Sequence, residues 1–380
     1  MNSGFGPTRS SVLTADFLAI TQSIPSDLKL VVDSNLLITG ASGFVGKWLT
    51  LSWLSARQEL NGSGRLMVVA RNVNQLRQLC SIYGATNEVI YVESDIRNFT
   101  IPSEFAPGYV IHAATPASES LNNQQPEEML SIIIEGQRNI LNESIRSGVE
   151  RFLFLSSGAV YGKQPLDVPY VAEDFSGGPL PTDIRSAYHE GKRVAELIGN
   201  IQAANNKISF VTGRLFAFLA PYLPFNSHFA AGNFLLDGMT GRDISVRSDG
   251  QSVRSYQYGS DLCVFLWALL IRGRSGEAYN VGSDEAGSIS NLAHQIKSTL
   301  STTSKVEILG EIDSATHTRY VPSIAKIKTE LSVSNVVDLQ SSIARTAEWY
   351  SEETRSTQRA NLTYIQTTFG VNHTNEAKSS

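Results

Sequence analysis

Cysteine is scarce in this chain, and that scarcity excludes two kinds of architecture. The 380 residues include only two cysteines, Cys80 and Cys263, which lie far apart in the sequence. Two distant cysteines make neither a disulfide framework nor a CxxC metal site. We interpret both as small core residues and expect no bound metal.

Basic charge and long apolar runs are also lacking. The formal net charge is -5, whereas a general nucleic-acid binder usually carries a basic excess. The longest apolar run, residues 262–271, is too short to cross a bilayer. The N-terminus has no basic stretch followed by an apolar block, so it is unlike a secretory signal. We therefore expect a cytoplasmic protein that binds neither nucleic acid nor membrane.

Short apolar segments alternate with helix-like segments from residue 35 onward. Strands are expected at 35–39, 66–70, 88–92, 109–112 and 151–156, and helices at 45–60, 73–83 and 127–147. This order predicts parallel strands with right-handed crossovers, and a run such as 152–155 is typical of a strand covered on both faces. The expected fold class is α/β, a doubly wound, Rossmann-like parallel sheet with ligands at the carboxyl ends of its strands.

Four regions follow from the pattern. Residues 1–34 are interpreted as an N-terminal extension with a short helix near 14–24, and residues 35–214 as the dinucleotide-binding domain with the catalytic residues. Residues 215–350, which proline and glycine break into short pieces, are interpreted mainly as a smaller, interleaved substrate-binding lobe. Residues 351–380 are a polar tail, and its last ten or so residues are expected to be disordered.

Three glycines recur at every third position directly after the first expected strand. Gly40 allows a tight turn, Gly43 lets a pyrophosphate approach the backbone, and Gly46 lets the next helix pack close to the sheet. That helix offers free N–H groups to phosphates. A glycine motif alone is common, but a strand before it and a helix after it favour dinucleotide binding over a merely structural turn. The expected cofactor contacts here are Gly40, Ser42, Gly43, Phe44, Val45 and Gly46.

The residues after the next strands bear on the choice of cofactor. An NAD site usually has an acidic residue about twenty residues past the turn, but this chain offers Arg71. A guanidinium can pair with a 2′-phosphate, so NADP is favoured over NAD, the alternative being that Arg71 is an ordinary surface arginine. Asp95 and Ile96 are placed to meet the adenine, unless Asp95 only caps the strand. Ala113 and Ala114, after the fourth strand, and Lys192 complete the expected cofactor contacts.

Tyr188 and Lys192 are one helical turn apart, so on a helix they share a face. A free tyrosine has a pKa of about 10, and a nearby ammonium is expected to lower it. The same lysine can reach the nicotinamide ribose, and Ser157 at the end of the fifth strand can hydrogen-bond a substrate oxygen. Together they supply a general acid/base, its activator and an orienting donor. A tyrosine–lysine pair alone is common, so its combination with the serine and the glycine turn carries the prediction.

Three motifs resemble the extended short-chain dehydrogenase/reductases, and more narrowly the NAD(P)-dependent epimerase/dehydratase group acting on nucleotide-linked sugars. They are GASGFVG at 40–46, SSGAVYG at 156–162 and YHEGK at 188–192, within a resemblance that covers roughly residues 35–350. It implies that Tyr188 exchanges a proton with the sugar while the nicotinamide exchanges a hydride, with Lys192 and Ser157 in their family roles. It also implies a homodimer formed through the helices around 127–147 and 188–204.

The resemblance also implies a set of substrate contacts. Asn233 matches the family asparagine that contacts the diphosphate, and Arg254 matches the arginine that clamps it; the alternative for each is an interface or surface polar residue. Thr115, Ser157 and Gly158 complete the set. A hydroxysteroid or flavanone-type reductase of the same superfamily would need an apolar pocket rather than Asn233 and Arg254.

The residues after Ser157 reduce the number of reaction types expected for this chain. Family dehydratases resemble one another in having Asp-Glu directly after the catalytic serine or threonine, and family decarboxylases carry a glutamate two places after it. This chain has Gly158 and Ala159, and neither can transfer a proton. Glu119 or Glu173–Asp174 could replace that carboxylate, but we interpret them as ordinary loop residues.

The lack of an acid directly after Ser157, together with Arg71, favours a 4-ketoreductase of a nucleotide-linked 4-keto-6-deoxyhexose. Such an enzyme would be of the dTDP-4-dehydro-6-deoxyglucose reductase type and would act in surface polysaccharide (O-antigen) biosynthesis. The alternatives are a 4-epimerase with tightly bound NAD and a non-catalytic dinucleotide-binding protein.

Overall fold

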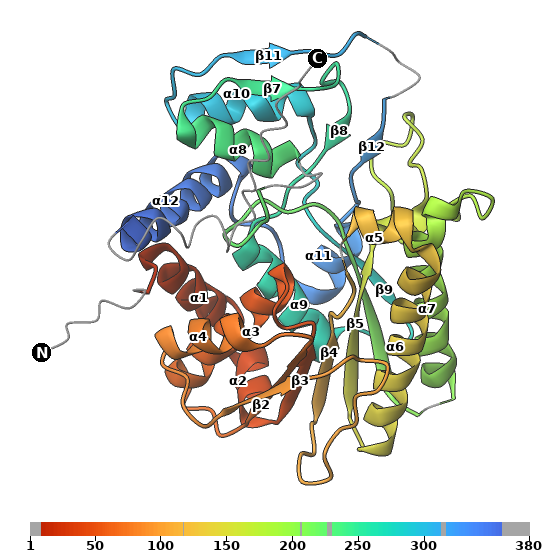
Figure 1. The fold of residues 1–380 in the computed structure, drawn as a ribbon. Coiled ribbons are helices and arrows are strands. Elements are labelled where there is room, and N and C mark those ends of the chain that lie inside the picture. The colour runs from red at the N-terminus through yellow and green to blue at the C-terminus, as the bar shows by residue number, and fades with distance from the viewer. Residues whose placement is uncertain (1–8, 117, 206, 226–229, 313–316, 359–380) are drawn as a thin grey trace, which may run out of the picture.

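The computed structural model describes residues 9–116, 118–205, 207–225, 230–312 and 317–358. Its centre is a parallel sheet of seven strands in the order β3-β2-β1-β4-β5-β6-β9 (Figure 1). The strands are β1 (Leu36–Thr39), β2 (Leu66–Ala70), β3 (Val89–Glu93), β4 (Tyr109–His112), β5 (Arg151–Ser157), β6 (Ser209–Leu215) and β9 (Ala278–Val281). The doubly wound fold is thus confirmed. The order reverses between β1 and β4, the place where ligands bind in such sheets.

Helices cover both faces of this sheet, and alternate residues of β1 show why. Leu36 and Ile38 belong to one buried apolar cluster together with side chains of α3 (Phe44–Glu59) and α9 (Gly259–Arg272). Leu37 belongs to another cluster with side chains of α6 (Pro126–Arg146) and α7 (Ala187–Ala204). Because successive strand residues point to opposite faces, an unbroken apolar strand requires both helical layers.

The N-terminal extension forms two helices rather than one. They are α1 (Ser11–Ser23), capped by the Ser10 hydroxyl, and α2 (Pro25–Asp33), which begins at the proline. Buried Asp16 of α1 accepts hydrogen bonds from the hydroxyl of Tyr258 at 2.6 Å and the guanidinium of Arg345 at 2.7 Å. Arg345 lies on α12 (Leu339–Gln358), so the extension is bound to the C-terminal helix. Because α12 continues to Gln358, part of the expected polar tail is helical; its last ten residues lie outside the described residues.

A second lobe lies above the carboxyl edge of the sheet (Figure 1). It contains α8 (Ala230–Thr240), α10 (Ile289–Thr299) and two small sheets with its own apolar core. One sheet has the order β10-β8-β12 and the other pairs β11 with β7. The strands are β7 (Ile244–Val246), β8 (Val253–Arg254), β10 (Gly287–Ser288), β11 (Val306–Ile308) and β12 (Arg319–Tyr320).

Residues 215–350 do not remain in the second lobe. Within them α9 and β9 return to the central sheet, and α11 (Ala325–Leu331) packs on both. The remaining described helices are α4 (Asn74–Ile82), α5 (Glu119–Gln124) and the short 3-10 helices η1 (Gly158–Tyr161) and η2 (Ile184–Ser186). The chain therefore alternates between the two parts, which places residues far apart in sequence at one edge of the sheet.

The scarce residues lie where the sequence indicated. Cys80 and Cys263 are both buried in the core, without a disulfide.

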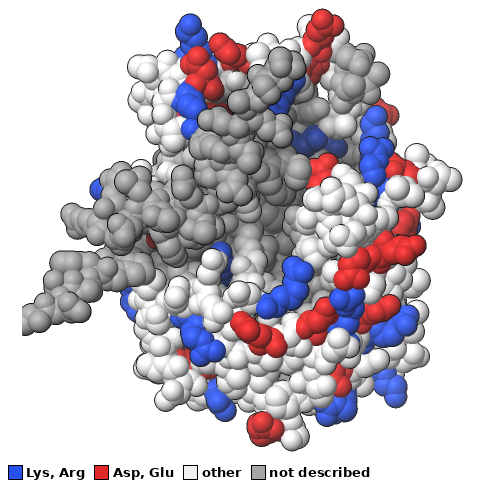
Figure 2. All heavy atoms as spheres, viewed as in Figure 1, with Lys and Arg blue, Asp and Glu red and all other residues white. Residues whose placement is uncertain are grey.

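No described helix is long and apolar enough to cross a membrane, and the described residues contain no cluster of potential metal ligands. On the face drawn in Figure 2, acidic and basic side chains are interspersed.

One buried carboxylate makes the stability of the fold dependent on pH. Asp261, in the first turn of α9, is 2% exposed and accepts hydrogen bonds from the N–H groups of Val336 and Val337. Burial raises its pKa to about 6, although those two bonds oppose the shift. The folded protein therefore binds this proton at a pH where the unfolded chain has lost it. Its contribution to stability falls as the pH rises from about 4 to about 6 and stays lost above that range.

We expect Asp261→Asn, which keeps an acceptor but cannot ionise, to gain stability relative to the wild type as the pH rises. The difference in the free energy of unfolding should grow by roughly 2–3 kcal/mol between pH 4 and 7, measured by urea denaturation. Asp338→Asn is the control, because the pKa of that exposed carboxyl is lowered by the Ser341 N–H, and its difference should change in the opposite direction. A difference for Asp261→Asn that is independent of pH would contradict this.

Candidate active site

The glycine turn connects β1 to α3 at the reversal of strand order. Gly40 has a φ of +70°, and a Cβ there would lie 2.6 Å from the backbone carbon of Ala113, directly after β4. A Cβ at Gly46 would lie 2.4 Å from the Gly40 oxygen. A side chain would not fit at either position. The backbone at Gly40 lies close to the end of β4, and the backbone at Gly46 lies close to the turn itself.

The N-terminus of α3 is arranged as an anion site. The residue at the N-cap position is Gly43, so no side chain there hydrogen-bonds to the N–H groups of the first turn. The first turn also has no acidic residue. Among the described residues, a Cβ at Gly43 would meet only the Gly40 oxygen, at 3.3 Å, so this side of the turn is open. Uncapped N–H groups and the positive end of the helix dipole suit a phosphate. Ser42, Phe44 and Val45 are partly exposed here, so these residues could hold the pyrophosphate of a dinucleotide.

Arg71 and Asp95 follow the next two strands, β2 and β3. The Arg71 side chain is exposed. The Asp95 carboxylate accepts hydrogen bonds from the Arg97 guanidinium at 2.7 and 3.0 Å, and these bonds lower its pKa, with a further contribution from the charge of Arg71. Ile96 is buried with its side chain against Gly136 of α6. Asp95 is therefore a fixed anion, and Ile96 can face a ligand mainly through its backbone.

The end of β4 carries a buried neutral histidine. His112 pairs with Thr39 of β1, and its Nδ1 lies 2.6 Å from the Thr39 hydroxyl. Burial lowers the pKa of His112 to about 3, and the nearby Lys192 ammonium contributes in the same direction. This bond joins β1 to β4 directly below Ala113 and Ala114, which are partly exposed.

Lys192 of α7 is buried beneath the carboxyl edge of the sheet. It is 3% exposed, and its Nζ donates to the Leu155 carbonyl at 2.6 Å and to the Thr115 hydroxyl at 2.8 Å. Burial lowers its pKa to about 7, with Glu196 opposing. Thr115, which we expected to contact substrate, is thus a partner of the lysine in this structure.

Tyr188 lies in the first turn of α7 and is positioned through its backbone. Its N–H donates to the Asn122 side chain at 2.9 Å, and the Asn122 amide donates to the Arg185 carbonyl at 2.7 Å. Burial raises the pKa of the Tyr188 phenol, and a hydrogen bond with Ser157 opposes the shift. The expectation that the lysine lowers this pKa is therefore wrong for the protein without ligand, because burial dominates and the Lys192 amine is directed to other partners.

Ser157 ends β5 between the two lobes. It is 8% exposed, accepts a hydrogen bond from the Ala159 N–H at 3.2 Å, and lies 3.4 Å from the hydroxyl of Tyr320 on β12. A Cβ at Gly158 would lie 2.5 Å from the Phe216 ring. Gly158 can therefore offer a substrate only its backbone, because any side chain would displace that ring.

The two expected diphosphate contacts lie in the second lobe. Asn233 is partly buried on α8. The guanidinium of Arg254, on β8, donates to the carbonyls of Val253 and Thr318 and to the Thr318 hydroxyl, over distances of 2.7–3.1 Å. Three hydrogen bonds thus hold the guanidinium in place. A guanidinium has five N–H donors, so it can also bind a ligand.

The comparisons with known proteins identify the family of the chain. The sequence profile of the NAD-dependent epimerase/dehydratase family matches residues 36–282, from β1 through β9. The chain belongs to this family. Among curated proteins, UDP-glucuronic acid decarboxylase 1 of Danio rerio is 28% identical over 374 residues, which is 95% of this chain and 82% of that protein.

Solved structures of other epimerases and dehydratases share the fold. Epimerase Mth375 from Methanothermobacter thermautotrophicus has a TM-score of 0.72 at 22% identity, covering 90% of this chain and 98% of that one. DesIV, a dTDP-glucose 4,6-dehydratase from Streptomyces venezuelae with NAD and TYD bound, has a TM-score of 0.70 at 20% identity, covering 84% and 97%. The family resemblance drawn from the three motifs is confirmed.

The hydrogen-bond partners found for Ser157 and Lys192 in the described part of the chain are not carboxylates. Lys192 donates to Leu155 and Thr115, and Ser157 lies against Ala159 and Tyr320. The Glu173 carboxylate accepts a hydrogen bond from the Asn280 N–H at 2.8 Å, so it serves the structure. Glu119 is exposed on the short helix α5.

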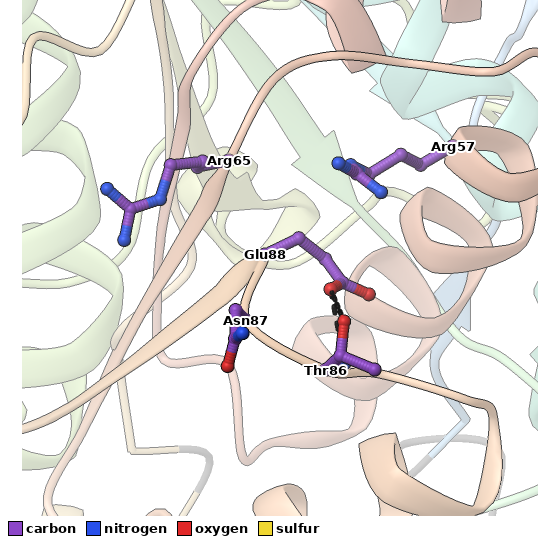
Figure 3. A pocket seen from close by; sticks show the side chains of 5 residues that line it. All are labelled: Arg57, Arg65, Thr86, Asn87 and Glu88. Atoms are coloured by element: carbon purple, nitrogen blue, oxygen red, sulfur yellow. Dashed lines mark hydrogen bonds between the residues drawn. The ribbon is translucent and has the colours of Figure 1, made fainter.

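A surface hollow lies elsewhere on the molecule. It has a volume of about 440 Å³ and is lined by Arg57, Arg65, Thr86, Asn87 and Glu88 (Figure 3). Its Glu88 carboxylate accepts a hydrogen bond from the Thr86 hydroxyl at 2.6 Å. These residues precede β2 and β3, so the hollow is at the amino edge of the sheet, opposite the glycine turn, and it is no part of the candidate site.

Two residues of the site escaped the sequence analysis. Asn122 holds the first turn of α7, and Tyr320 brings a second phenol to Ser157. Neither belongs to a motif, and each reaches the site from a different part of the chain. Only a three-dimensional arrangement reveals them.

We expect Tyr188→Phe to lower the turnover rate by about 10²- to 10⁴-fold, the range for loss of a general acid/base. Cofactor affinity, measured by fluorescence titration with NADH and with NADPH, should stay unchanged, because the Asn122 contact is to the Tyr188 backbone. Tyr170→Phe, which alters an exposed tyrosine, is the control and should retain wild-type turnover. Full activity of Tyr188→Phe would exclude proton transfer by this phenol.

Proposed function

We propose that this protein is an NADP-dependent 4-ketoreductase of a nucleotide-linked 4-keto-6-deoxyhexose. The observation that carries the proposal is the buried Tyr188 phenol, whose pKa is raised by burial and lowered in part by Ser157. A protonated acid at this place suits reduction of a ketone, whose oxygen must gain a proton. The nucleotide-sugar substrate class rests on membership of the family, together with Asn233 and Arg254 in the second lobe.

Ser157, Tyr188 and Lys192 would each have a separate role in this reduction. When bound, NADPH would supply the hydride to the carbonyl carbon. The Ser157 hydroxyl would hydrogen-bond the carbonyl oxygen, and the Tyr188 O–H bond would break as its proton passes to that oxygen. The Lys192 ammonium would stabilise the phenolate left behind, since an adjacent cation favours the charged form of a phenol. Electrons and protons then balance as one hydride and one proton added to one carbonyl.

The decarboxylase activity of the curated relatives is not carried over to this chain. By the family pattern a decarboxylase carries a glutamate two places after the catalytic serine or threonine, and Ala159 occupies that position here. The hydrogen-bond partners found for Ser157 in the described residues are Ala159 and Tyr320, neither of which is an acid. A methyl group cannot transfer a proton, so we propose reduction rather than decarboxylation.

The proposal is tested by incubating the protein with NADPH and a panel of nucleotide-linked 4-keto-6-deoxyhexoses. We expect the absorbance of reduced nicotinamide to fall with at least one of them, and mass spectrometry to show a product two hydrogens heavier. Interconversion of unmodified UDP-sugars without added cofactor would instead identify a 4-epimerase. Release of carbon dioxide from UDP-glucuronic acid would identify a decarboxylase, and cofactor binding without any turnover a non-catalytic protein. Each of these three results contradicts the proposal.

Arg71 supports NADP as the cofactor. Its exposed guanidinium follows β2 and lies close enough to Asp95 to affect the pKa of that carboxyl. The chain thus offers a cation, and no acid, at the position that binds the 2′ end of the adenosine ribose in this fold.

We expect Arg71→Ser to raise the KM for NADPH by roughly 10- to 100-fold, the value of one charge-assisted hydrogen bond. The KM for NADH should stay within twofold, because NADH lacks the 2′-phosphate. Arg65→Ser is the matched control, since Arg65 is an exposed arginine at the opposite edge of the sheet. If the KM rose equally for NADPH and NADH, or did not rise for NADPH, Arg71 would have no part in selecting the cofactor.

We also propose that two copies of the chain pair through α6 and α7, which lie side by side (Figure 1). On α7, Val194, Leu197 and Ile201 are 38%, 59% and 48% exposed. Their spacing places them on one helix face, where burial against a second copy would remove them from water. Sedimentation equilibrium should give the mass of two chains, and the mass of one would contradict this.

A further inference from the structure

A tyrosine from the second lobe reaches the catalytic serine. The hydroxyl of Tyr320, on β12, lies 3.4 Å from the Ser157 Oγ and 3.3 Å from the carbonyl oxygen of Leu215, to which it donates. Its ring packs on Phe216 with centroids 4.6 Å apart. Because the ring is held by Phe216 and the hydroxyl by Leu215, the phenol oxygen has a fixed position beside Ser157.

Ser157 therefore lies between two phenols. One is Tyr188 of α7, whose pKa Ser157 affects, and the other is Tyr320 of β12, whose hydroxyl lies 3.4 Å from the Ser157 Oγ. Burial raises the pKa of Tyr320, the hydrogen bond with Ser157 opposes the shift, and the neighbouring Tyr188 adds to it. The single proton of the Tyr320 hydroxyl goes to the Leu215 carbonyl, and lone pairs of its oxygen can accept a hydrogen bond. A ketone oxygen has only two lone pairs, so the hydroxyls of Ser157 and Tyr188 satisfy it, and the third hydroxyl is left for another oxygen.

The small sheet of the second lobe joins this hydroxyl to the expected phosphate contact. Tyr320 on β12 pairs directly with Arg254 on β8 in a parallel register. Directly paired residues of neighbouring strands lie about 5 Å apart with side chains on the same face, and the charge of Arg254 affects the pKa of Tyr320. One rigid pair of strands thus presents a guanidinium and, beside it, a phenol that points to the catalytic serine.

We propose that Tyr320 is a further catalytic-site residue, whose phenol oxygen, with its own proton bonded to the Leu215 carbonyl, accepts a hydrogen bond from the sugar hydroxyl next to the reacting carbonyl. This rests on the proposed function. In a 4-keto-6-deoxyhexose the hydroxyl on a carbon directly bonded to the carbonyl carbon is the one at C3, because C5 carries the ring oxygen. Ser157 and Tyr188 hold the carbonyl oxygen, Tyr320 holds O3, and Arg254 holds the diphosphate at the other end. These contacts fix which carbon of the sugar faces the cofactor.

The test combines a variant of the protein with a variant of the substrate. Tyr320→Phe removes the hydroxyl but keeps the ring on Phe216, so the fold should be retained. With the substrate accepted by the wild type, kcat/KM should fall roughly 10- to 100-fold, as expected for one lost hydrogen bond to substrate. The KM for NADPH should not change. With the 3-deoxy analogue of that substrate, the wild type should show a similar loss and Tyr320→Phe no further loss.

Tyr161→Phe is the matched control. The Tyr161 ring also lies against Phe216, with centroids 6.3 Å apart, but its hydroxyl bonds to Asn280 and Arg214 instead of Ser157. It should lower the thermal stability and leave kcat/KM within twofold of the wild type.

Three results would overturn the inference, and they are distinguishable. Wild-type kinetics of Tyr320→Phe would show that this hydroxyl does not touch the substrate. Equal losses in Tyr320→Phe and Tyr161→Phe, or a further loss of Tyr320→Phe with the 3-deoxy analogue, would make Tyr320 a structural residue only. In both cases the proposed function would stand. A wild-type protein that turns over no nucleotide sugar would remove the proposed function, and this inference with it.

Discussion

The burial of one amine determines the arrangement of the site. Lys192 is almost completely covered, and its Nζ bonds to the carbonyl of Leu155 and the hydroxyl of Thr115. An amine without partners at this depth would be costly, so α7 must lie where both partners can be reached. That placement joins α7 to the end of β5 and to the segment after β4. Tyr188, one turn earlier on the same helix, is thereby brought beside Ser157.

Both parts of the molecule contribute residues to the candidate site. The central sheet supplies the glycine turn, Ser157, Tyr188 and Lys192, whereas the second lobe supplies Arg254 and Tyr320. The chain passes between the two parts several times, because β9 and α9 belong to the sheet while β8 and β12 belong to the lobe. A substrate held by both parts would have its diphosphate at one end and its reacting carbon at the other. The Glu173 carboxylate has a structural role instead, because it accepts a hydrogen bond from the Asn280 N–H.

The sequence predicted what depends on local pattern. The apolar runs placed β1, β2, β4 and β5 within about two residues, and the glycine spacing predicted the turn before α3. It did not predict α2, which follows from a proline start directly after α1, nor the return of β9 to the sheet. Asn122 and Tyr320 also escaped, because they reach the site only through folding. The pKa of Tyr188 was predicted in the wrong direction, because sequence spacing shows that a lysine is near but not that burial outweighs it.

The most direct test of the account is the titration of Lys192 in the protein without ligand, followed by NMR of isotopically labelled lysine and assigned with Lys192→Arg. An amine buried against Leu155 and Thr115 should titrate at about 7. A lysine amine that lies in water has a pKa of about 10.4, and this is the reference for the comparison. If Lys192 titrated near that value, the amine would be in water, and the contacts that position Tyr188 beside Ser157 would not exist.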